Sequence, residues 1–479
     1  MRSEEAGTPW GMSPATHPLI AGAHGYDSGE CFDEAFDDSG RPRPQYEEIL
    51  GHLESADLDA LTTKVRTLLD EEGVAFGGED GHPFCVDPVP RILTTDEWSG
   101  LSEGLCQRVR ALDAFLEDVY GEQRVVAEGI VPAHVVTGSA YFEKDLVGVP
   151  RSTGARIGLA GLDVVRDRAG GFRVLEDNVR TPSGIAYAMA ASDVLQEVLP
   201  VRRPTNGARQ TTVDALRGAM ESSAPGVEGE LVLLTDGPEN SAWYEHQRLA
   251  KMADLQLATP GELRRKGTRI ELADGRRVRA VYRRTGEDRV REESGAFTPL
   301  AELLVDPLAA GEVGVVNWFG NGVADDKNLY MYVDELVRFY LGEEPLVRSV
   351  PTHDLTDPER LDEVIDRLDE LVVKPRNGQG GDGVVVGPTA SADEIAKVRA
   401  AVRKSPDEWI AQDVVSLSTH PTVVEGRLVP RHVDLRPFVF FDGRQAVVPE
   451  GGLTRVAMQE GSMVVNSSQD GGGKATWVA

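Results

Sequence analysis

The sequence predicts an α+β protein built from several subdomains. At 479 residues the chain is too long for a single hydrophobic core. Long segments repeat apolar residues at helical spacing, whereas short apolar runs bounded by glycine and proline indicate β-strands. Helices and strands therefore share the fold.

The N-terminal part is expected to be helical after an irregular start. Residues 1–30 are rich in Gly, Pro, Ser and His without periodicity, and are predicted to be disordered or loosely attached. Segments 43–72 and 95–120 repeat leucine and other apolar residues three or four positions apart, which is typical of amphipathic helices. Residues 31–130 are therefore predicted to form an N-terminal helical region.

Residues 162–178 form the most informative segment. Two short strands, LDVV and FRVLEDN, flank a turn with two glycines. Side chains alternate along a strand, so Glu176 and Asn178 project from one face. A hairpin whose paired residue numbers add to an odd sum puts Asp163 on that face as well. Two carboxylates and an amide offer the hard oxygen ligands that Mg²⁺ uses beside nucleotide phosphates. The alternative is an amphipathic hairpin with a solvated polar face.

A second phosphate-binding signal lies much later in the chain. In LVVKPRNGQGGDGVVVGP (371–388) an apolar strand ends at Lys374, a glycine loop follows, and a second apolar strand leaves it. The lysine can place its ammonium group against phosphates, and an unpaired buried charge is otherwise costly. A glycine-rich hairpin turn is the alternative. The loop glycines, which let backbone N–H groups approach phosphate oxygens, are Gly378, Gly380, Gly381 and Gly383.

Two more segments fit a nucleotide site. WIAQDVV (409–415) is predicted to be a buried strand interrupted by Gln412 and Asp413, which suits the hinge beside an adenine ring. Residues 326–340 form a strongly amphipathic pattern, which predicts a helix. Lys327 lies in its first turn, where acidic residues are preferred, which favours a functional role over a merely exposed lysine.

Three other segments carry weaker expectations. Residues 231–236 predict a strand that leads through Gly-Pro to a helix at 241–253. Residues 271–284 are predicted to form a hairpin around an Asp-Gly turn, with a solvated basic edge. The glycine-rich segment 471–474 is predicted to be either a flexible tail or a lid over substrate.

Composition indicates a cytoplasmic protein. Three cysteines without CxxC spacing indicate neither a disulfide framework nor a zinc site. We expect no membrane partner, because no apolar run approaches the length of a membrane span and the N-terminus does not resemble a signal peptide. The formal charge of −29 argues against nucleic acid as a partner, since phosphate backbones require a basic face.

The order of these motifs resembles the ATP-grasp superfamily, in particular its circularly permuted branch. In ordinary ATP-grasp enzymes the lysines and glycine loop precede the metal ligands; here they follow, as in glutathionylspermidine synthetase. The chain is still more similar to the uncharacterised type 2 family of permuted ATP-grasp proteins, often encoded beside a small helical partner protein. The resemblance covers nearly the whole chain after about residue 30 and is carried by PRPQYEEIL (42–50), DPVPRIL (87–93), QRVRALDAFLEDVYGEQ (107–123), LEDNVRTPSG (175–184), NGVADDKNLYMYVDELVRFYLGEEPLVRSVPT (321–352), RHVDLRPFV (431–439), GGLTRVA (451–457) and GSMVVNSSQDGGGKATWV (461–478).

The resemblance implies a circularly permuted ATP-grasp fold with a Rossmann-like pre-ATP-grasp subdomain and N-terminal helices. The implied subdomains are a metal-binding half (131–205), a pre-ATP-grasp-like α/β region (206–350), a glycine-loop nucleotide subdomain (351–412) and the remainder of the core (413–479).

The resemblance also implies ATP and Mg²⁺ as cofactors and assigns roles to single residues. Arg180 and Arg455, like Arg91, are candidate carboxylate anchors, with structural ion pairs as the alternative. The implied roles are Mg²⁺–phosphate ligand for Asp163, Glu176 and Asn178, nucleotide lysine for Lys327 and Lys374, adenine hinge for Gln412 and Asp413, and contact with the transferred phosphate for Arg436.

The implied activity is ATP-dependent joining of a carboxylate to an amine through an acylphosphate, with release of ADP and phosphate. Substrates would be small molecules or peptides. Two alternatives stay open: a non-catalytic ATP-binding component that acts with a partner protein, and a kinase-type phosphotransferase. Gly161 departs from glutathionylspermidine synthetases, which carry arginine there, so the substrate of those enzymes does not transfer.

Overall fold

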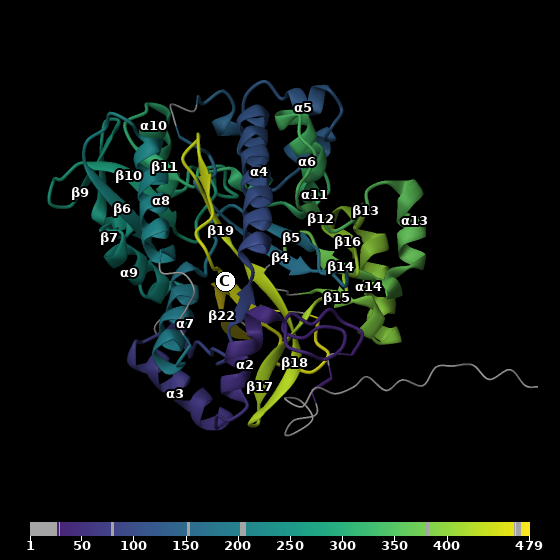
Figure 1. The fold of residues 1–479 in the computed structure, drawn as a ribbon. Coiled ribbons are helices and arrows are strands. Elements are labelled where there is room, and N and C mark those ends of the chain that lie inside the picture. Colours follow the sequence, from purple (N-terminus) through teal and green to yellow (C-terminus); the bar gives the residue numbers. More distant parts are fainter. Residues whose placement is uncertain are drawn as a thin grey trace, which may run out of the picture.

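The computed structural model describes residues 26–27, 29–77, 81–150, 154–201, 207–378, 383–463, 465 and 471–479. These residues contain both helices and strands, partly in separate runs, which confirms the α+β class (Figure 1). Three sheets of four or more strands organise the described residues.

The largest sheet has ten strands and runs through the centre of the molecule (Figure 1). Its main path is β12-β5-β4-β18-β21-β22-β3, with β17 beside β18, β19 beside β4 and β20 beside β19. Most neighbours are antiparallel, but β12 runs parallel to β5, and β22 to β3. The strands are β3 (Arg91–Leu93), β4 (Leu159–Arg166), β5 (Phe172–Asn178), β12 (Arg348–Ser349), β17 (Thr419–Val424), β18 (Arg427–Arg436), β19 (Phe438–Phe441), β20 (Ala446–Val447), β21 (Leu453–Val456) and β22 (Gly472–Val478).

Strand β22 corrects the expected tail or lid at residues 471–474. It lies between β21 and β3, and all of its residues are buried. Glycines fit here because neighbouring side chains leave no room: a Cβ on Gly473 would lie 2.5 Å from the Phe84 ring. Glycine content alone suggested flexibility, whereas close packing explains it.

A four-stranded parallel sheet lies on one side of the central sheet, in the order β11-β10-β6-β7. Helices α8 (Ala208–Ser223) and α9 (Trp243–Met252) pack against it. This confirms the strand and helix expected between 231 and 253. The strands are β6 (Glu230–Thr235), β7 (Gln256–Ala258), β10 (Val278–Arg284) and β11 (Gly314–Val316).

The hairpin expected at 271–284 is present only beside its turn, where the Leu272 N–H bonds to the Arg276 carbonyl and Glu271 forms an antiparallel bridge with Arg277. The Asp-Gly turn is present, but β10 is an interior strand that pairs in parallel with β6 and β11. Strand β9 (Arg269–Leu272) pairs instead with β8 (Leu263–Lys266). Arg283 and Arg284 are therefore buried rather than part of a solvated basic edge.

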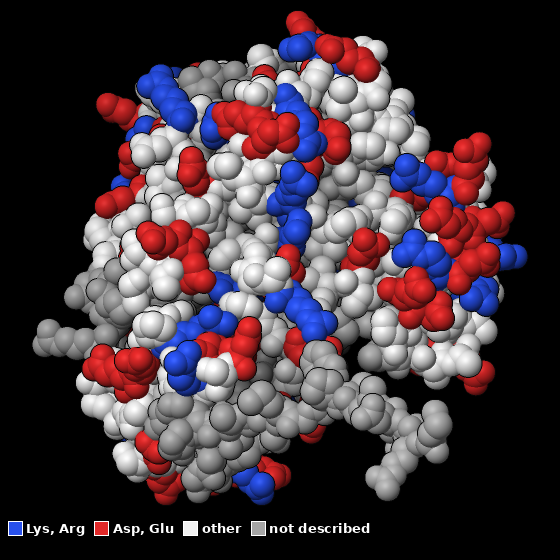
Figure 2. Space-filling model, turned by 45° about the vertical axis from the view of Figure 1, so that its right-hand side comes forward, with Lys and Arg blue, Asp and Glu red and all other residues white. Residues whose placement is uncertain are grey.

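A third sheet is antiparallel, in the order β13-β16-β14-β15. Helices α13 (Pro358–Asp366) and α14 (Ala392–Lys404) share a core with it. Figure 2 shows acidic side chains, mixed with basic ones, on the outer side of this unit, in keeping with the negative charge of the chain. The strands are β13 (Thr352–Asp354), β14 (Leu371–Pro375), β15 (Val385–Val386) and β16 (Trp409–Asp413), which confirms the strand–loop–strand pattern and the strand at 409–415.

Helices in the N-terminal region follow the predicted spacing with one interruption. The segment expected at 43–72 divides because Asp57 caps a new helix by accepting the Ala60 N–H. Helix α4 (Thr95–Val119) is continuous and starts with a capping box at Thr94 and Glu97. Of the expected disordered residues, 1–25 and 28 lie outside the described residues.

The remaining helices are mostly short. In the described part of the chain, no helix combines the length and apolarity that crossing a membrane requires. The helices and strands not yet described are η1 (Pro44–Tyr46), α2 (Glu47–Leu53), α3 (Leu58–Glu71), β1 (Ala75–Phe76), β2 (His82–Pro83), α5 (Arg124–Ala127), α6 (Ala133–Thr137), η2 (Lys144–Leu146), α7 (Ile185–Val198), η3 (Pro260–Glu262), α10 (Pro299–Ala309), η4 (Asn321–Val323), η6 (Leu368–Glu370), η7 (Gly387–Thr389) and η8 (Pro406–Glu408).

The helix expected at 326–340 is a series of short helical segments. These are α11 (Lys327–Tyr330), α12 (Val333–Leu336) and a π-helical turn, η5 (Val337–Leu341). Between the first two, the Tyr332 N–H bonds to the Leu329 carbonyl, three residues back, which tightens the turn. The aliphatic residues of the pattern are nevertheless buried and its tyrosines are partly buried, so the spacing predicted the buried face and not the continuity.

Candidate functional site

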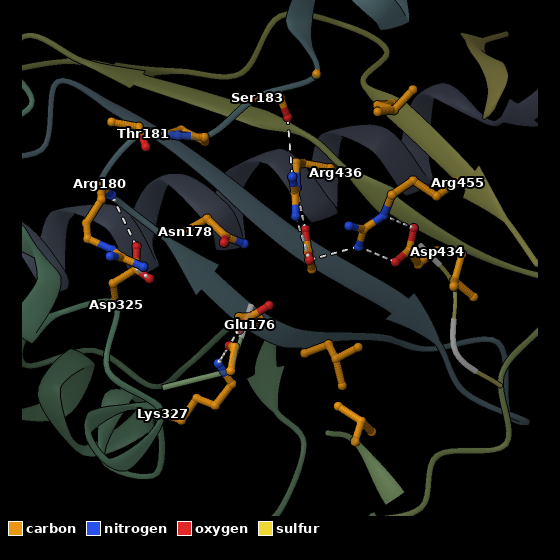
Figure 3. A pocket seen from close by; sticks show the side chains of 18 of the residues that line it. Glu176, Asn178, Arg180, Thr181, Ser183, Asp325, Lys327, Asp434, Arg436 and Arg455 are labelled. Carbon is orange, nitrogen blue, oxygen red and sulfur yellow. Dashed lines mark hydrogen bonds and ion pairs between the residues drawn. The ribbon is translucent and has the colours of Figure 1, made fainter. Parts of the chain in front are cut away.

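A cavity of about 550 Å³ lies where the three sheets meet. Strands β4, β5, β18 and β21 supply one wall, and β14, β15 and β16 supply another. The end of β10 and the loop after β6 supply a third. Glu176 and Lys374 both line this cavity, so the hairpin and the glycine segment face one site despite their separation in sequence (Figure 3).

The β4–β5 hairpin reaches the cavity through a change of register. Next to the turn Arg166 pairs with Phe172, an even-sum register that contradicts the expected one. An irregularity beyond this point shifts the pairing by one residue, so that Asp163 lies opposite Glu176. The expected odd-sum pairing is therefore absent beside the turn and present where Asp163 faces Glu176.

Asp163 is held by two arginines. Arg436 donates from Nε and Nη2 to the two carboxylate oxygens at 2.6 and 2.8 Å, and Arg455 Nη2 lies 2.8 Å from Oδ2. Burial by itself would raise the pKa of Asp163, but the two guanidinium groups outweigh it and hold that pKa below its usual value. Arg455 also binds Asp434, and Figure 3 shows the two arginines and Asp434 pointing toward one another. Charges thus alternate along one buried network.

The second carboxylate expected to bind metal is less enclosed. Glu176 Oε1 lies 3.0 Å from Lys327 Nζ, and 35% of the Glu176 side chain is exposed. Asn178 follows on the same strand, and its buried Nδ2 has no hydrogen-bond partner among the described residues. Lys327 Nζ also donates to the Gly378 carbonyl at 2.8 Å. Lys327 therefore connects the hairpin to the start of the glycine loop.

The donor set suits Mg²⁺ in part. Glu176 and Asn178 give two oxygen donors on one strand face, and Mg²⁺ usually takes one or two protein ligands together with phosphates and water. Asp163 differs, because both of its oxygens already accept from guanidinium groups. In the part of the chain that the structure describes, no group of three His, Cys, Asp or Glu residues could hold a metal ion. Of the three expected ligands, Glu176 and Asn178 therefore fit Mg²⁺ better than Asp163 in this arrangement.

Lys374 is partly buried, and the charges of Glu176 and Asp163 offset the cost of burying its ammonium group only in part. Its Nζ donates to Gln412 Oε1 at 2.7 Å, and no carboxylate among the described residues forms an ion pair with it. Burial lowers the pKa of Lys374 to about 8. An ammonium group kept in this environment is costly unless an anion completes it. A phosphate group has the charge and the acceptor oxygens to do so.

The remaining nucleotide candidates are placed unevenly. Gln412 is buried beside Lys374, whereas Asp413 Oδ1 accepts from His353 Nε2 at 2.8 Å. Gln412 and Asp413 both line the cavity. Gly378 also lines it. Gly383 has a left-handed backbone (φ 71°), which a side chain would strain. Gly380 and Gly381 lie outside the described residues.

The other arginine candidates differ in their positions. Arg180 lines the cavity, where it pairs with Asp288 (3.3 Å) and Asp325 (3.5 Å). Arg91 lies elsewhere and forms a buried ion pair with Glu34 at 2.6 Å, which confirms the structural alternative for that residue.

Arg284 is a cavity residue that the sequence interpretation missed. It ends β10, is buried, and donates to Ser183 Oγ (2.6 Å) and Glu245 Oε1 (3.2 Å). Glu245 Oε2 in turn accepts the N–H groups of Gly184 and Ala186. These contacts fasten the loop before α7 to the parallel sheet. Assigning β10 as a parallel strand would have revealed Arg284, because side chains at the carboxyl ends of such strands face ligand sites.

The structure also explains the departure at Gly161. A Cβ at this position would lie 2.8 Å from Pro182 Cβ and 3.3 Å from Arg436 Cδ. An arginine could not be accommodated without displacing both. The space that a side chain would use belongs to Arg436.

Comparison with known proteins agrees with this geometry. Residues 90–457 match the family described as circularly permuted ATP-grasp type 2. An uncharacterized protein of Mycobacterium tuberculosis is 40% identical over 97% of this chain and 87% of its own length, and one of Synechocystis is 38% identical over 95% and 98%. A Frankia alni protein named "Putative glutamate--cysteine ligase 2-3" is 44% identical over 93% of this chain, which spans 54% of that longer protein.

One solved structure shows a likeness of fold. A glutathione synthetase-like effector from Globodera pallida, in its apoform, superposes with a TM-score of 0.53 at 8% sequence identity. The match covers 89% of this chain and 99% of that one. The fold likeness does not decide the family, which is shown by the similarity in sequence. The chain belongs to the circularly permuted ATP-grasp type 2 family.

Proposed function

We propose that the protein is an ATP-dependent carboxylate–amine ligase that releases ADP and phosphate. The observation that carries this proposal is the partly buried ammonium of Lys374, which forms no ion pair among the described residues, in the same cavity as Lys327. Two lysines from separate units around one cavity suit a polyphosphate. Membership of the ATP-grasp family supports ATP as its source.

The nucleotide would lie along the wall formed by the antiparallel sheet. Val372 and Val386 line the cavity there and offer an apolar surface for adenine, beside Gln412 and Asp413 as the hinge. Lys327 and Lys374 would hold the α- and β-phosphates, with backbone groups of the glycine loop. Mg²⁺ bound with ATP would neutralise phosphate charge, and Glu176 and Asn178 would hold it.

The carboxylate and amine substrates would enter from the opposite end. That end is formed by Arg284 at the end of β10, and by Asn240 and Ser241 after β6. Arg436 and Arg455 line the same cavity and are oriented by Asp163. Arg180 and Arg455 are the candidates for anchoring a substrate carboxylate.

The proposed reaction has two steps. The substrate carboxylate oxygen attacks the γ-phosphorus of ATP; the bond to the β–γ bridging oxygen breaks, giving ADP and an acylphosphate. The amine then attacks the acyl carbon, loses a proton, and displaces phosphate. Arg436 would stabilise the charge on the phosphoryl group while the lysines keep it in line. No covalent bond to the protein is needed.

Several coarser features complete the proposal. The parallel sheet would be the Rossmann-like pre-ATP-grasp part within residues 206–350, and residues 351–412 the glycine-loop subdomain. We infer a cytoplasmic enzyme acting on small molecules or peptides, with a small helical protein as a possible partner in the cell. The Frankia relative's name fits this ligase class, although this chain matches only about half of that protein.

The test is incubation with ATP-Mg²⁺ and a panel of amino acids, short peptides and polyamines. Phosphate release is followed together with new masses. ADP with an amide product supports the ligase. ADP with a stable phosphoester would indicate a kinase, and tight ATP binding without turnover would indicate a non-catalytic component; either result contradicts the proposal.

A further inference from the structure

An ion pair between Asp326 and Arg376 lies at the junction of two units beside the cavity. Arg376 donates from Nε and Nη2 to the two carboxylate oxygens at 2.8 and 2.7 Å. The Asp326 side chain is 2% exposed and that of Arg376 12%. A bidentate pair this enclosed fixes the relative orientation of the two segments, because both donors must stay aligned with both acceptors.

Asp326 is itself held firmly by its surroundings. Its Oδ1 caps helix α11 by accepting the Asn328 N–H at 3.0 Å, and its Oδ2 accepts from Ser139 Oγ at 2.7 Å. Arg376 directly follows β14, and its own N–H bonds to the Glu408 carbonyl at 2.8 Å. The pair therefore joins two anchored backbones rather than two free side chains.

Each member of the pair is a near neighbour of one cavity lysine. Lys327 follows Asp326 directly, and Lys374 precedes Arg376 by two positions. Arg376 lies in the turn directly after β14, so its pairing with Asp326 holds the end of the strand that carries Lys374. The bond from Lys327 to the Gly378 carbonyl crosses this junction as well.

We propose that the Asp326–Arg376 pair positions the two lysines, setting the separation of their ammonium groups to fit a polyphosphate. The inference rests on the proposed function, because it takes a nucleotide as the ligand. Neither member of the pair has to touch the nucleotide. Charges already held in place bind more tightly than charges that must first be ordered. Loss of the pair should therefore weaken binding more as the nucleotide carries more phosphates.

The experiment compares Arg376→Gln with the unaltered protein by titration calorimetry. AMP, ADP and a non-hydrolysable ATP analogue are used, each with Mg²⁺. We expect affinity for the ATP analogue to fall about tenfold and affinity for AMP to change less than about twofold, the range of ordinary coupling energies. Arg376→Lys keeps the charge without the bidentate geometry and should recover part of the loss.

A matched control comes from the same unit. Arg367 pairs with Glu370 at 3.0 Å, but both side chains are exposed and belong to one unit, so Arg367→Gln should leave all three affinities unchanged. In Asp326→Asn with Arg376→Gln, the loss should not exceed that of the single variant, because both remove the same interaction.

Hydrogen exchange without nucleotide gives an independent reading. Arg376→Gln should speed exchange in 371–376, and Arg367→Gln should not. Equal losses for AMP and the ATP analogue, or no loss at all, would overturn the inference. Failure of the unaltered protein to bind any nucleotide would instead contradict the proposed function. In that case, unchanged hydrogen exchange in Arg376→Gln would also reject the role of the Asp326–Arg376 pair in holding the two segments together.

Discussion

At the scale of single residues, the cavity treats two charged groups in opposite ways. Asp163 is matched by two guanidinium groups, whereas Lys374 bonds to the amide oxygen of Gln412 and forms no ion pair among the described residues. The first charge is stabilised before any ligand arrives. The second becomes favourable only when an anion joins it. The unmatched group is therefore the better marker of the ligand.

A proton should accordingly be taken up when nucleotide binds. Burial lowers the pKa of Lys374 to about 8, against about 10.4 for an unfolded chain. Its burial penalises the folded state fully below about pH 8, and the penalty fades as pH rises toward the unfolded value. Phosphate favours the charged form, so at about pH 9 binding of ATP-Mg²⁺ should absorb up to one proton.

Calorimetry in buffers of different ionisation enthalpy measures this uptake. Lys374→Met is the control, because it removes the titrating group. A binding enthalpy at about pH 9 that does not depend on the buffer would refute the prediction.

Glu176→Gln should abolish metal-dependent turnover while the protein stays folded. Loss of one charge-stabilising group lowers rates by roughly 10²-fold or more. The partly exposed pair with Lys327 contributes at most about 1 kcal/mol to stability. Phosphate release and urea unfolding measure the two effects. Glu335→Gln, which removes an exposed pair with Arg338, should change neither. Full activity in a folded Glu176→Gln protein would reject the metal assignment.

The sequence could predict residues whose role depends on local alternation. The alternation of side chains along a strand predicted that Glu176 and Asn178 share one face. An apolar run that ends in a lysine indicated Lys374 as a candidate phosphate-binding residue. Arg284 was missed because its role depends on which strands β10 pairs with. Asp326 and Arg376 were missed because neither belongs to a local sequence pattern. Their contact joins two residues that lie 50 positions apart in the sequence.

At the scale of elements, the predictions were right where apolar spacing determines which residues are buried. They failed where the structure depends on which strands pair with one another. The apolar face of 326–340 was right although the helix is interrupted, because the apolar spacing determines burial. The hairpin at 271–284 was right only beside its turn, since the parallel neighbours of β10 cannot be predicted from the residues of that strand alone. The glycines of 471–474 indicated a flexible tail or a lid, whereas the Phe84 ring leaves no room for a Cβ at Gly473.

Strand β4 offers a test of such packing. Gly161→Ala should destabilise the fold by about 1–3 kcal/mol, because its Cβ would press on Pro182 and Arg436. Gly218, in helix α8, has open space around it, so Gly218→Ala should stabilise by about 0.5–1 kcal/mol. Urea unfolding measures both. Equal stability of the Gly161→Ala protein would show that this part of the sheet relaxes freely.

At the scale of the whole molecule, one buried lysine joins three distant segments. Lys474 is fully buried in β22 and bonds to Asp87, to the Pro421 carbonyl at 3.0 Å and to the Val89 carbonyl at 3.4 Å. Its partners come from both ends of the chain. Such contacts cannot be predicted from sequence spacing, because 387 residues separate Lys474 from Asp87.

Removing this lysine should destabilise the molecule strongly. Lys474→Met leaves Asp87 buried without its countercharge, which costs about 3–5 kcal/mol. Adding Asp87→Asn should recover part of the loss, because the uncompensated charge is then gone. Lys404→Met, at the end of helix α14, is the control and should have little effect. Denaturant unfolding of the four proteins decides the matter, and a Lys474→Met protein of normal stability would contradict the account.

The parallel pairing of β3 with β22 also has a consequence for biosynthesis. Strand β3 contains residues 91–93, but its partner ends at residue 478. At ribosomal rates of about 5–20 residues per second, roughly 20–80 s pass between the synthesis of the two strands. During that time the edge of β3 has no β22 to pair with, and the central sheet remains incomplete. The segment that contains β3 must therefore remain without its parallel partner until β22 has been synthesised.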